Sequence, residues 1–520
     1  MNFDSTLTTD VLIIGGGGAA LRAAIEAYKH DVNVLIVDKG TLGYSGSTAT
    51  AKAELILFAA VQDKLDSINS HVKDTLIAGA GFANEKLVKV LAKEAPLRLK
   101  ELESFGVEFE KDDGKFKCVK GFAHSFPRCR VLKGRSEEGI LFALMKEIKM
   151  LGIPYLENTM ITHILQTEGR IAGAIGINSE GNFLLIHAKS IILACGGGGQ
   201  AYLHNVYQPI MTGDGYVLAF EAGAKLANMK FIQMGPGLIY PAYLIFSAPM
   251  WKLIPRLYNG KSEEFLDKYI PFKVDTSKLI SEKEFPFNPK SLTKYVDIAI
   301  YSEILKGNTS PHGGIYYDIT HKSYDEIQEL APYTYSRLKQ LGLDPLKQPL
   351  EIGIVVQCFL GGIIIDEKSQ TNVQGLFACG EVATGAHGEQ RPGGNSLAEC
   401  QVFGARAGRF AAEFSKKHSR SIIIKDNEKI KIEKLLKLFK KESKFNPNEI
   451  KREIQEIMFY NVGIVKSIKS LYKAKEELEK IEFKKFPYIK INDKNELVSA
   501  LSVKNLLTTA KFIVNSALSS

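Results

Sequence analysis

A glycine-rich turn near the start of the chain has the residue types and spacing that bind a phosphate. Gly15, Gly17 and Ala20 satisfy the pattern G-x-G-x-x-[GA] directly after the apolar run at residues 11–14. The first glycine permits the bend, the second lets the backbone approach a pyrophosphate, and a small third residue lets helix and strand pack closely. Asp38 lies twenty-three positions after Gly15, where a second strand should end and a carboxylate can bind ribose hydroxyls. The segment therefore predicts a dinucleotide site, with the pyrophosphate at a helix N-terminus.

Two later strands that end in glycines indicate which dinucleotide is bound. The segment 371–388 contains a short strand that ends at Ala378 and is followed by Gly380 and Glu381. A carboxylate at that place can accept hydrogen bonds from the ribitol of a flavin, which favours FAD. Another apolar strand, within residues 188–202, also runs into glycines, and these allow close backbone approach. Three such strands spread over the chain predict a large FAD-binding fold that is interrupted by an inserted domain.

Length and composition predict an ordinary globular protein of two or three domains. The residues are 45% hydrophobic and 24% charged, a composition that is usual for soluble proteins. A chain of 520 residues is too long to form a single hydrophobic core. The net charge of +9 comes from basic residues spread along the chain, so it does not predict nucleic-acid binding. The six cysteines have no C-x-x-C and no metal-ligand spacing, which predicts reduced thiols and no metal site. The first ten residues lack a signal pattern, so we expect a cytoplasmic protein.

Residues 231–251 form an uncharged stretch of twenty-one residues, which is long enough to span a bilayer. Two glycines and three prolines interrupt this stretch. They would break a helix repeatedly and leave backbone groups that lipid cannot satisfy. We therefore predict no transmembrane segment, with membrane association only through partners, and expect this stretch to be buried within the protein.

Six motifs occur in this order along the chain: "IIGGGGAALRAA", "AHSFPR", "LACGGGGQ", "TGDGYVLAFEAGA", "GLFACGEV" and "HGEQRPGGNSLAE". Together they resemble the flavoprotein subunit of the succinate dehydrogenase and fumarate reductase family, including its thiol-linked and L-aspartate-oxidase-like relatives. The Lys-rich end of the chain looks like the helical domain of that family, so the resemblance runs nearly end to end.

The resemblance implies an α/β fold class, with a Rossmann-like FAD-binding domain, an inserted α+β capping domain and a C-terminal helical domain. The FAD-binding domain would comprise residues 1–230 and 352–412. The capping domain would comprise residues 231–351, and the helical domain residues 413–520. The capping domain is expected to move over the flavin.

The resemblance also implies where FAD binds. Asp38 and Lys39 would lie near the adenosine ribose, and Glu381 would contact the ribitol. Membrane-bound relatives attach the flavin to a histidine, and this chain has Gly46 at that place, so we expect FAD without a covalent link. The expected cofactor-binding residues are Gly15, Gly17, Ala19, Ala20, Asp38, Lys39, Ser45, Gly46, Ser47, Ala194, Cys195, Gly196, Asp214, Gly380, Glu381, Arg391, Asn395, Ser396 and Leu397.

The chemistry of the family is hydride transfer between the flavin and the carbon–carbon bond of a dicarboxylate. Histidines and arginines clamp the two carboxylates, since charged, bidentate contacts fix the geometry. Gly235 and Gly237 stand where relatives have a histidine and a threonine, and Gln357 stands where they have a second histidine. Of these clamping positions, only Arg391 retains its expected residue.

The place of the catalytic arginine depends on how residues 247–256 are aligned. An ungapped alignment puts Trp251, the only tryptophan, at that position. A shifted alignment puts Arg256 there instead. Lys252 is a further candidate cation, although an ammonium clamps a carboxylate less well than a guanidinium. The expected catalytic residues are Arg391, Trp251, Gln357 and Arg256.

Three functional hypotheses follow from these replacements. In the first, an FAD-dependent oxidoreductase transfers a hydride between flavin and a small organic acid other than a dicarboxylate, and exchanges electrons through an iron–sulfur partner subunit. In the second, the protein is a conventional fumarate reductase or succinate dehydrogenase that uses Arg256 or Lys252. In the third, it is a non-catalytic electron-transfer flavoprotein subunit whose substrate pocket is plugged by Trp251.

Overall fold

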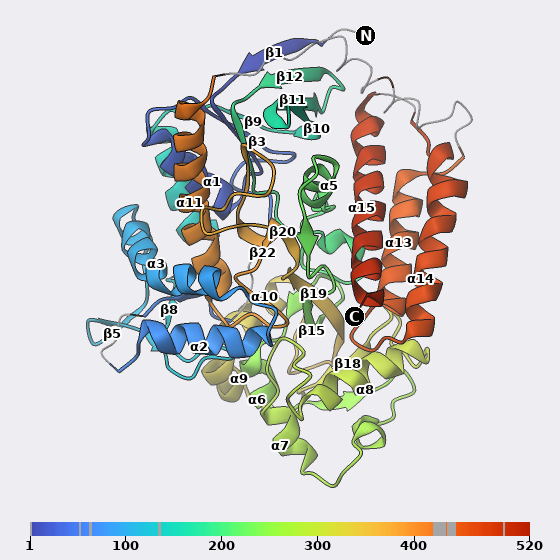
Figure 1. The fold of residues 1–520 in the computed structure, drawn as a ribbon. Coiled ribbons are helices and arrows are strands. Elements are labelled where there is room, and N and C mark those ends of the chain that lie inside the picture. Colours follow the sequence, from blue (N-terminus) through green and yellow to red (C-terminus); the bar gives the residue numbers. More distant parts are fainter. Residues whose placement is uncertain are drawn as a thin grey trace.

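The computed structural model describes residues 3–50, 54–61, 65–133, 137–419, 433, 444–491 and 494–519. Its centre is a five-stranded parallel sheet (Figure 1). The strands, in spatial order, are β21 (Leu376–Ala378), β13 (Ser190–Leu193), β2 (Val11–Ile14), β3 (Val34–Val37) and β9 (Tyr155–Leu156). The first four are short and apolar apart from Ser190, and every residue in them is buried, as expected where both faces of a parallel sheet are covered.

Two helices cover this sheet and pack against each other. Helix α1 (Gly18–Tyr28) follows β2 directly, and α11 (Asn395–Lys417) arrives almost four hundred residues later. Gly404 and Gly408 of α11 lie against the backbone of α1. A Cβ added to Gly404 would lie 2.8 Å from the carbonyl oxygen of Ala19. The missing side chains let these two helices approach closely, which brings the start of α11 beside the glycine-rich turn.

Smaller elements surround the central sheet. A four-stranded sheet lies above it in Figure 1, with the order β1 (Ser5–Thr8), β12 (Phe183–His187), β11 (Arg170–Asn178) and β10 (Thr159–Thr167). One three-stranded sheet consists of β14 (Leu226–Ala227), β20 (Gly362–Ile364) and β22 (Ala383–Thr384). Another consists of β4 (Leu57–Ala59), β8 (Cys129–Val131) and β7 (Cys118–Val119). The remaining hairpin and helices are β5 (Lys111–Asp112), β6 (Lys115–Phe116), α2 (Ile68–Gly79), α3 (Glu85–Ser104), α4 (Phe142–Met150) and α5 (Asp214–Glu221).

The inserted part of the chain forms an antiparallel sheet with short helices, in the lower half of Figure 1. Its strands, in order, are β16 (Leu244–Ile245), β15 (Ile232–Leu238), β19 (Leu350–Phe359), β18 (Ile315–Asp318) and β17 (Arg256–Tyr258). Its helices are α6 (Ala248–Lys252), α7 (Thr276–Ser281), α8 (Lys294–Leu305), α9 (Tyr324–Leu330) and α10 (Pro332–Gln340). The predicted domain boundary at residue 352 falls within β19, so the division of the chain into domains stays a prediction.

The uncharged stretch 231–251 is part of this sheet. It forms β15, a turn, β16 and the short helix α6, and six of the seven residues of β15 are buried. Gly237 pairs with Ile245, and a Cβ added there would lie 2.5 Å from the carbonyl oxygen of Leu244. The prediction that this stretch is part of the protein interior rather than a membrane helix is confirmed for its strands, whereas Tyr240, Pro241 and Tyr243 in the turn are exposed.

The C-terminal part is a bundle of the helices α13 (Pro447–Asn461), α14 (Ile468–Lys480) and α15 (Lys494–Leu518), which pack against one another at the right of Figure 1. One helix among the described residues, at Glu496–Leu518, is long and apolar enough to cross a membrane by those two criteria. Of the eighteen residues that form its most apolar part, 61% are buried inside the protein, as in the core helix of a bundle. The parallel sheet, the inserted α+β part and this bundle together match the predicted fold class.

Candidate active site

A cavity of about 500 Å³ lies where the carboxyl ends of β2, β13 and β21 meet the inserted part of the chain. Residues of the glycine-rich turn and of the segments 45–50, 194–196 and 379–381 line one portion of it. The other portion is lined by Ile245, Ser247, Ala248, Pro249, Lys252 and residues 284–286 and 357–358. Crevices at the carboxyl ends of parallel strands are the usual ligand sites of such sheets. We call the two portions the cofactor half and the substrate half.

The glycine-rich turn has the geometry of a pyrophosphate cradle. Gly15 has a φ of +125°, and a Cβ there would overlap the carbonyl oxygen of Ala194. Around Gly17, by contrast, the nearest atom to an added Cβ is Thr48 Oγ1 at 4.0 Å. Helix α1 starts with Gly17 as its N-cap, which has no side chain to cap the helix, and the Gly18 N–H makes a long hydrogen bond to Thr48 Oγ1 at 3.4 Å. The N–H groups of a helix start and the helix dipole both favour a bound anion.

Acidic and basic groups close the far end of the cofactor half. Burial raises the pKa of Asp38, against the opposing hydrogen bond from Ser45. Lys39 Nζ donates to Asp214 Oδ2 at 2.8 Å and to Thr212 Oγ1 at 2.9 Å. This ion pair fixes the segment that follows residue 210 against the end of β3. Asp38 and Lys39 both line the cavity, and their contact with the adenosine ribose stays a prediction.

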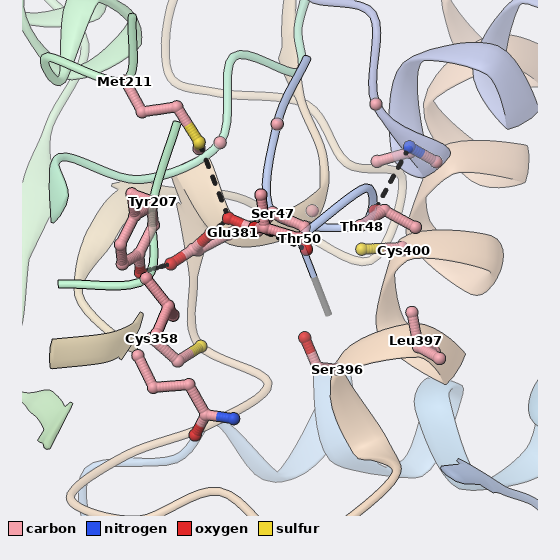
Figure 2. A pocket seen from close by; sticks show the side chains of 18 of the residues that line it. Ser47, Thr48, Thr50, Tyr207, Met211, Cys358, Glu381, Ser396, Leu397 and Cys400 are labelled. Atoms are coloured by element: carbon pink, nitrogen blue, oxygen red, sulfur yellow. Dashed lines mark hydrogen bonds between the residues drawn. The ribbon is translucent and has the colours of Figure 1, made fainter. Parts of the chain in front are cut away.

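Glu381 lies deep in the cofactor half and accepts three hydrogen bonds (Figure 2). Ser47 Oγ donates to Oε2 at 2.8 Å, while the Phe359 N–H donates to Oε1 at 2.8 Å and Tyr207 also donates to Oε1. A carboxylate has about four lone-pair positions, so Oε2 can still accept from a ribitol hydroxyl. Burial raises the pKa of Glu381, and these hydrogen bonds oppose the shift. Sequence reasoning missed Tyr207, which lies between two recognised motifs in a segment without a signal of its own.

The start of α11 supplies a second uncapped helix N-terminus at the cavity. Its N-cap Gly394 has a φ of +77° and no side chain bonds to the first turn. Ser396 and Leu397 line the cavity, as Figure 2 shows, whereas Asn395 does not. Ala20 is likewise fully buried away from the cavity. All the other expected cofactor-binding residues line it.

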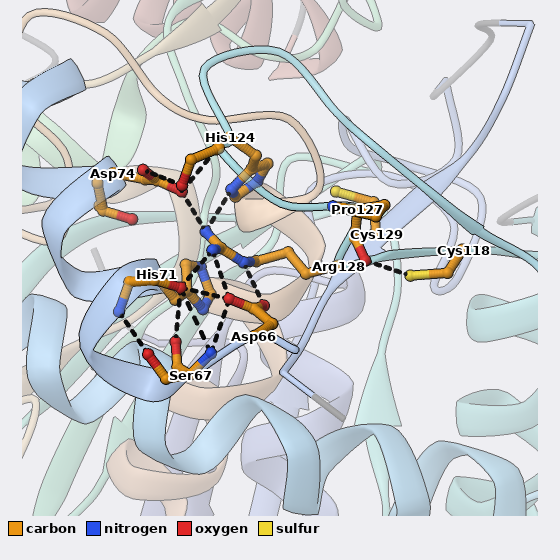
Figure 3. Close-up of polar contacts among 12 residues, drawn as sticks. Asp66, Ser67, His71, Asp74, Cys118, His124, Pro127, Arg128 and Cys129 are labelled. Atoms are coloured by element: carbon orange, nitrogen blue, oxygen red, sulfur yellow. Dashed lines mark hydrogen bonds and ion pairs between the residues drawn. The ribbon is translucent and has the colours of Figure 1, made fainter. Parts of the chain in front are cut away.

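A buried polar network supports the loop before α11 (Figure 3). His124 Nε2 bonds to the carbonyl oxygen of Gly393 at 2.8 Å, and His71 Nε2 bonds to Asn395 Oδ1 at 2.8 Å. Burial lowers the pKa of both histidines to about 4, so both are neutral at physiological pH. Arg128, itself fully buried, bonds to His124 Nδ1 at 2.9 Å and to Asp74 at 2.7 Å. Asn395 therefore positions α11 rather than touching a ligand.

Trp251 does not face the cavity, which corrects the expectation from the ungapped alignment. Its side chain is fully buried, and its indole N–H donates to the carbonyl oxygen of Phe246 at 3.0 Å. Its ring packs edge-on against Tyr317. A large apolar ring gains most by burial, and this one forms the core of the inserted part instead of plugging the pocket.

Arg256 does not reach the cavity either. It lies on β17, opposite Asp318, with an exposed side chain. Of the two alternative cations, Lys252 lines the cavity and is exposed at its rim. Neither alignment therefore places a guanidinium from residues 247–256 in the substrate half.

The groups that do line the substrate half are few. Arg391 is the only arginine among the described residues that line the cavity, and no histidine is found among them. Gln357 lines it as expected. Phe285, which sequence reasoning missed, also lines it, and its ring lies 2.9 Å from where a Cβ on Gly235 would be. An aromatic ring therefore fills the space toward which a side chain at position 235 would point.

Comparison with known proteins agrees with this geometry. The FAD binding domain family matches residues 10–397, and the fumarate reductase flavoprotein C-terminal family matches residues 451–519. A fumarate reductase (CoM/CoB) subunit of Methanothermobacter marburgensis is 34% identical over 528 residues, covering 98% of this chain and 92% of that protein. The chain belongs to the fumarate reductase and succinate dehydrogenase flavoprotein family.

Other members of the flavoprotein family are similar over nearly the whole chain. An uncharacterised FAD-dependent oxidoreductase of Methanocaldococcus jannaschii is 34% identical over 516 residues, covering 98% of this chain and 91% of that protein. The structure of Mycobacterium smegmatis Sdh1 in complex with UQ1 matches with a TM-score of 0.87 and 28% identity, over 99% of this chain and 88% of that one. The protein is therefore an FAD-dependent oxidoreductase, and the glycine cradle and Glu381 fit that cofactor.

We predict that the FAD of this flavoprotein is held without a covalent bond. Gly46 has no side chain to bond with, and a Cβ there would meet nothing closer than Gly17 Cα at 3.8 Å. The four cysteines that line the cavity are poor nucleophiles, because burial raises the pKa of each thiol. Denaturation in acid followed by centrifugation should leave all the yellow colour in the supernatant. Flavin fluorescence that stays with the denatured polypeptide on a gel would contradict this prediction.

Proposed function

We propose that this flavoprotein transfers a hydride between FAD and a small organic acid that carries a single carboxylate. In this proposal Arg391 binds the carboxylate, and apolar groups surround the rest of the molecule. The observation that carries the proposal is the Phe285 ring beside Gly235. The ring occupies the space where the histidine that relatives are expected to have at position 235 would lie. A phenyl ring there favours an apolar substrate group and offers no hydrogen bond to a second carboxylate.

The remaining lining residues support the same substrate class. Ile245, Ala248 and Pro249 add apolar surface to the substrate half. A second carboxylate placed among these groups would lose its hydration without gaining a guanidinium clamp, because the cation beside them is Lys252 at the exposed rim, and this loss is costly for a buried charge. A single carboxylate on Arg391 meets no such penalty, because the guanidinium presents paired N–H donors.

The protein's own groups would orient the substrate and keep water out. Bound FAD supplies a hydride acceptor or donor. Arg391 holds the carboxylate at one end, and Phe285 with Pro286 shields the carbon chain. The exposed Lys252 and Glu284 at the rim are candidates to pass the proton that balances a hydride added to a double bond. Trp251 does not line this half although its helix neighbours do, which favours a working pocket over a degenerate one.

We further propose that electrons reach or leave the flavin through an iron–sulfur partner subunit. The Methanothermobacter relative is named as a subunit, which supports an assembly. Iron–sulfur clusters carry electrons between proteins, and a flavin that exchanges a hydride with a substrate must return to its starting redox state through a second partner, a role that such a cluster can fill.

A second candidate is conventional fumarate reduction, which the name of that relative favours. In this case Lys252 would supply the second cation, since Arg256 does not line the cavity. This candidate requires fumarate turnover that depends on Lys252. The substitution Lys252→Gln would then abolish turnover while leaving FAD bound.

The proposal is tested with a panel of unsaturated acids and methyl viologen reduced by dithionite. We expect kcat/KM for crotonate or cinnamate to exceed that for fumarate by at least about tenfold, because an unclamped second carboxylate costs free energy on burial. Fumarate turnover that is faster than that of both monocarboxylates, and that is lost in Lys252→Gln, would replace the proposal with the second candidate.

A further inference from the structure

A buried amide makes the shorter of two hydrogen bonds from the guanidinium of Arg391. Arg391 Nε donates to Gln233 Oε1 at 3.0 Å. Gln233 Nε2 in turn donates to the carbonyl oxygen of Arg391 at 3.2 Å. One glutamine side chain therefore contacts the same arginine at both its side chain and its backbone. Gln233 is only 2% exposed, so neither of these bonds competes with bulk water.

The orientation of this amide is fixed by what its neighbours can do. A guanidinium can only donate, so the atom facing Arg391 Nε must be the amide oxygen. Gln233 Nε2 also lies 3.4 Å from Gln390 Oε1, and Gln390 Nε2 donates to the carbonyl oxygen of Phe287 at 3.0 Å. That carbonyl can only accept. The chain of donors therefore runs in one direction, from Arg391 through Gln233 and Gln390 to Phe287.

The elements that carry these residues come from both sides of the cavity. Gln233 lies on β15, opposite Cys358 of β19. Phe287 follows the ring of Phe285 that lines the substrate half, and its N–H donates to the carbonyl oxygen of Met234 at 2.8 Å. Arg391 lies in the loop before α11. The amides thus tie the loop that carries the arginine to the wall of the inserted part.

This arrangement has a consequence for how an acid binds. Nε is occupied by Gln233, and Nη1 makes only a long contact of 3.5 Å with the carbonyl oxygen of Pro392. The two terminal nitrogens are therefore the natural donors for a bidentate carboxylate. A neutral amide also leaves the full positive charge of Arg391 available. A carboxylate at position 233 would form a competing ion pair with the same arginine.

We propose that Gln233 is a positioning residue that orients Arg391 toward the substrate carboxylate and preserves its charge. This inference rests on the proposed function, in which Arg391 binds that carboxylate. Nearly isosteric substitutions separate the two roles. Gln233→Glu keeps the shape and adds a competing charge, whereas Gln233→Leu keeps most of the packing and removes the hydrogen bonds.

The experiment measures binding of cinnamate to the oxidised FAD-bound protein by the change in flavin absorbance, with turnover as a second readout. At pH 8 we expect Gln233→Glu to raise the Kd of cinnamate at least about thirtyfold, since hydrogen bonds between charged groups are the strong ones. Gln233→Leu should raise KM about tenfold with little change in kcat.

Gln374→Glu serves as the matched control, because Gln374 is exposed and does not line the cavity. It should leave the Kd of cinnamate unchanged at pH 8. If Gln233→Glu binds cinnamate at pH 8 as the unsubstituted protein does, the positioning role is wrong. If Arg391→Gln itself leaves cinnamate binding unchanged, the proposed function fails instead.

Discussion

Replacing Arg391 with glutamine should lower kcat/KM for the acid substrate about a thousandfold while FAD stays bound. Loss of one partner of a desolvated charged pair costs several kcal/mol, and each 1.4 kcal/mol is a factor of ten. No other arginine among the described residues lines the cavity, so the structure offers no guanidinium to replace it. Steady-state kinetics, with the flavin content of the purified variant measured by absorbance, tests this expectation.

Two further variants act as controls for Arg391. Arg391→Lys should recover only a small part of the activity, because an ammonium cannot bind a carboxylate bidentately. Arg256→Gln should change kcat/KM less than about twofold, since surface substitutions remote from a site have small effects. The reverse pattern, with Arg256 essential and Arg391 dispensable, would show that the shifted alignment had identified the catalytic arginine.

The second large effect concerns the glycine-rich turn. Gly15→Ala should purify almost free of FAD and with lower thermal stability, because its φ is +125° and the added Cβ overlaps the backbone of Ala194. Gly17→Ala should behave differently, because a Cβ there meets only Thr48 Oγ1 at 4.0 Å. Its apoprotein should melt as the unsubstituted apoprotein does, yet its Kd for FAD should rise about tenfold or more, since a pyrophosphate needs that space.

Melting curves of the apoproteins and titrations with FAD measure the two effects separately. A Gly17→Ala protein that binds FAD with unchanged affinity would mean that the pyrophosphate does not approach this turn. A Gly17→Ala apoprotein that melts as early as Gly15→Ala would mean that the space beside Gly17 is needed for folding rather than for the cofactor.

The cofactor half could be predicted from the sequence because its constraints are local. A strand that ends in glycines, followed by a helix, brings backbone N–H groups to a ligand whatever the rest of the chain does. Gly15, Gly17 and Glu381 therefore lie at the cavity as the motifs indicate. The direction of the Asn395 side chain could not be predicted in this way, because it depends on a hydrogen bond with His71, which lies over three hundred residues away in the sequence.

The substrate half could not be predicted in the same way, because it is assembled from packing between distant segments. The ungapped alignment predicts Trp251 beside the flavin, but the direction of a side chain on a five-residue helix depends on the core beneath it. Here that core includes Tyr317 of β18. The ring that lies beside Gly235 comes from Phe285, fifty positions later. No local pattern connects those two residues.

The most direct test of the account is a crystal structure of the FAD-bound protein with cinnamate. We expect the carboxylate to lie on the terminal nitrogens of Arg391, with Nε of that arginine still bonded to Gln233 and the phenyl group against Phe285. Density that instead placed the carboxylate on a cation from residues 247–256, with Arg391 turned away from it, would contradict the account.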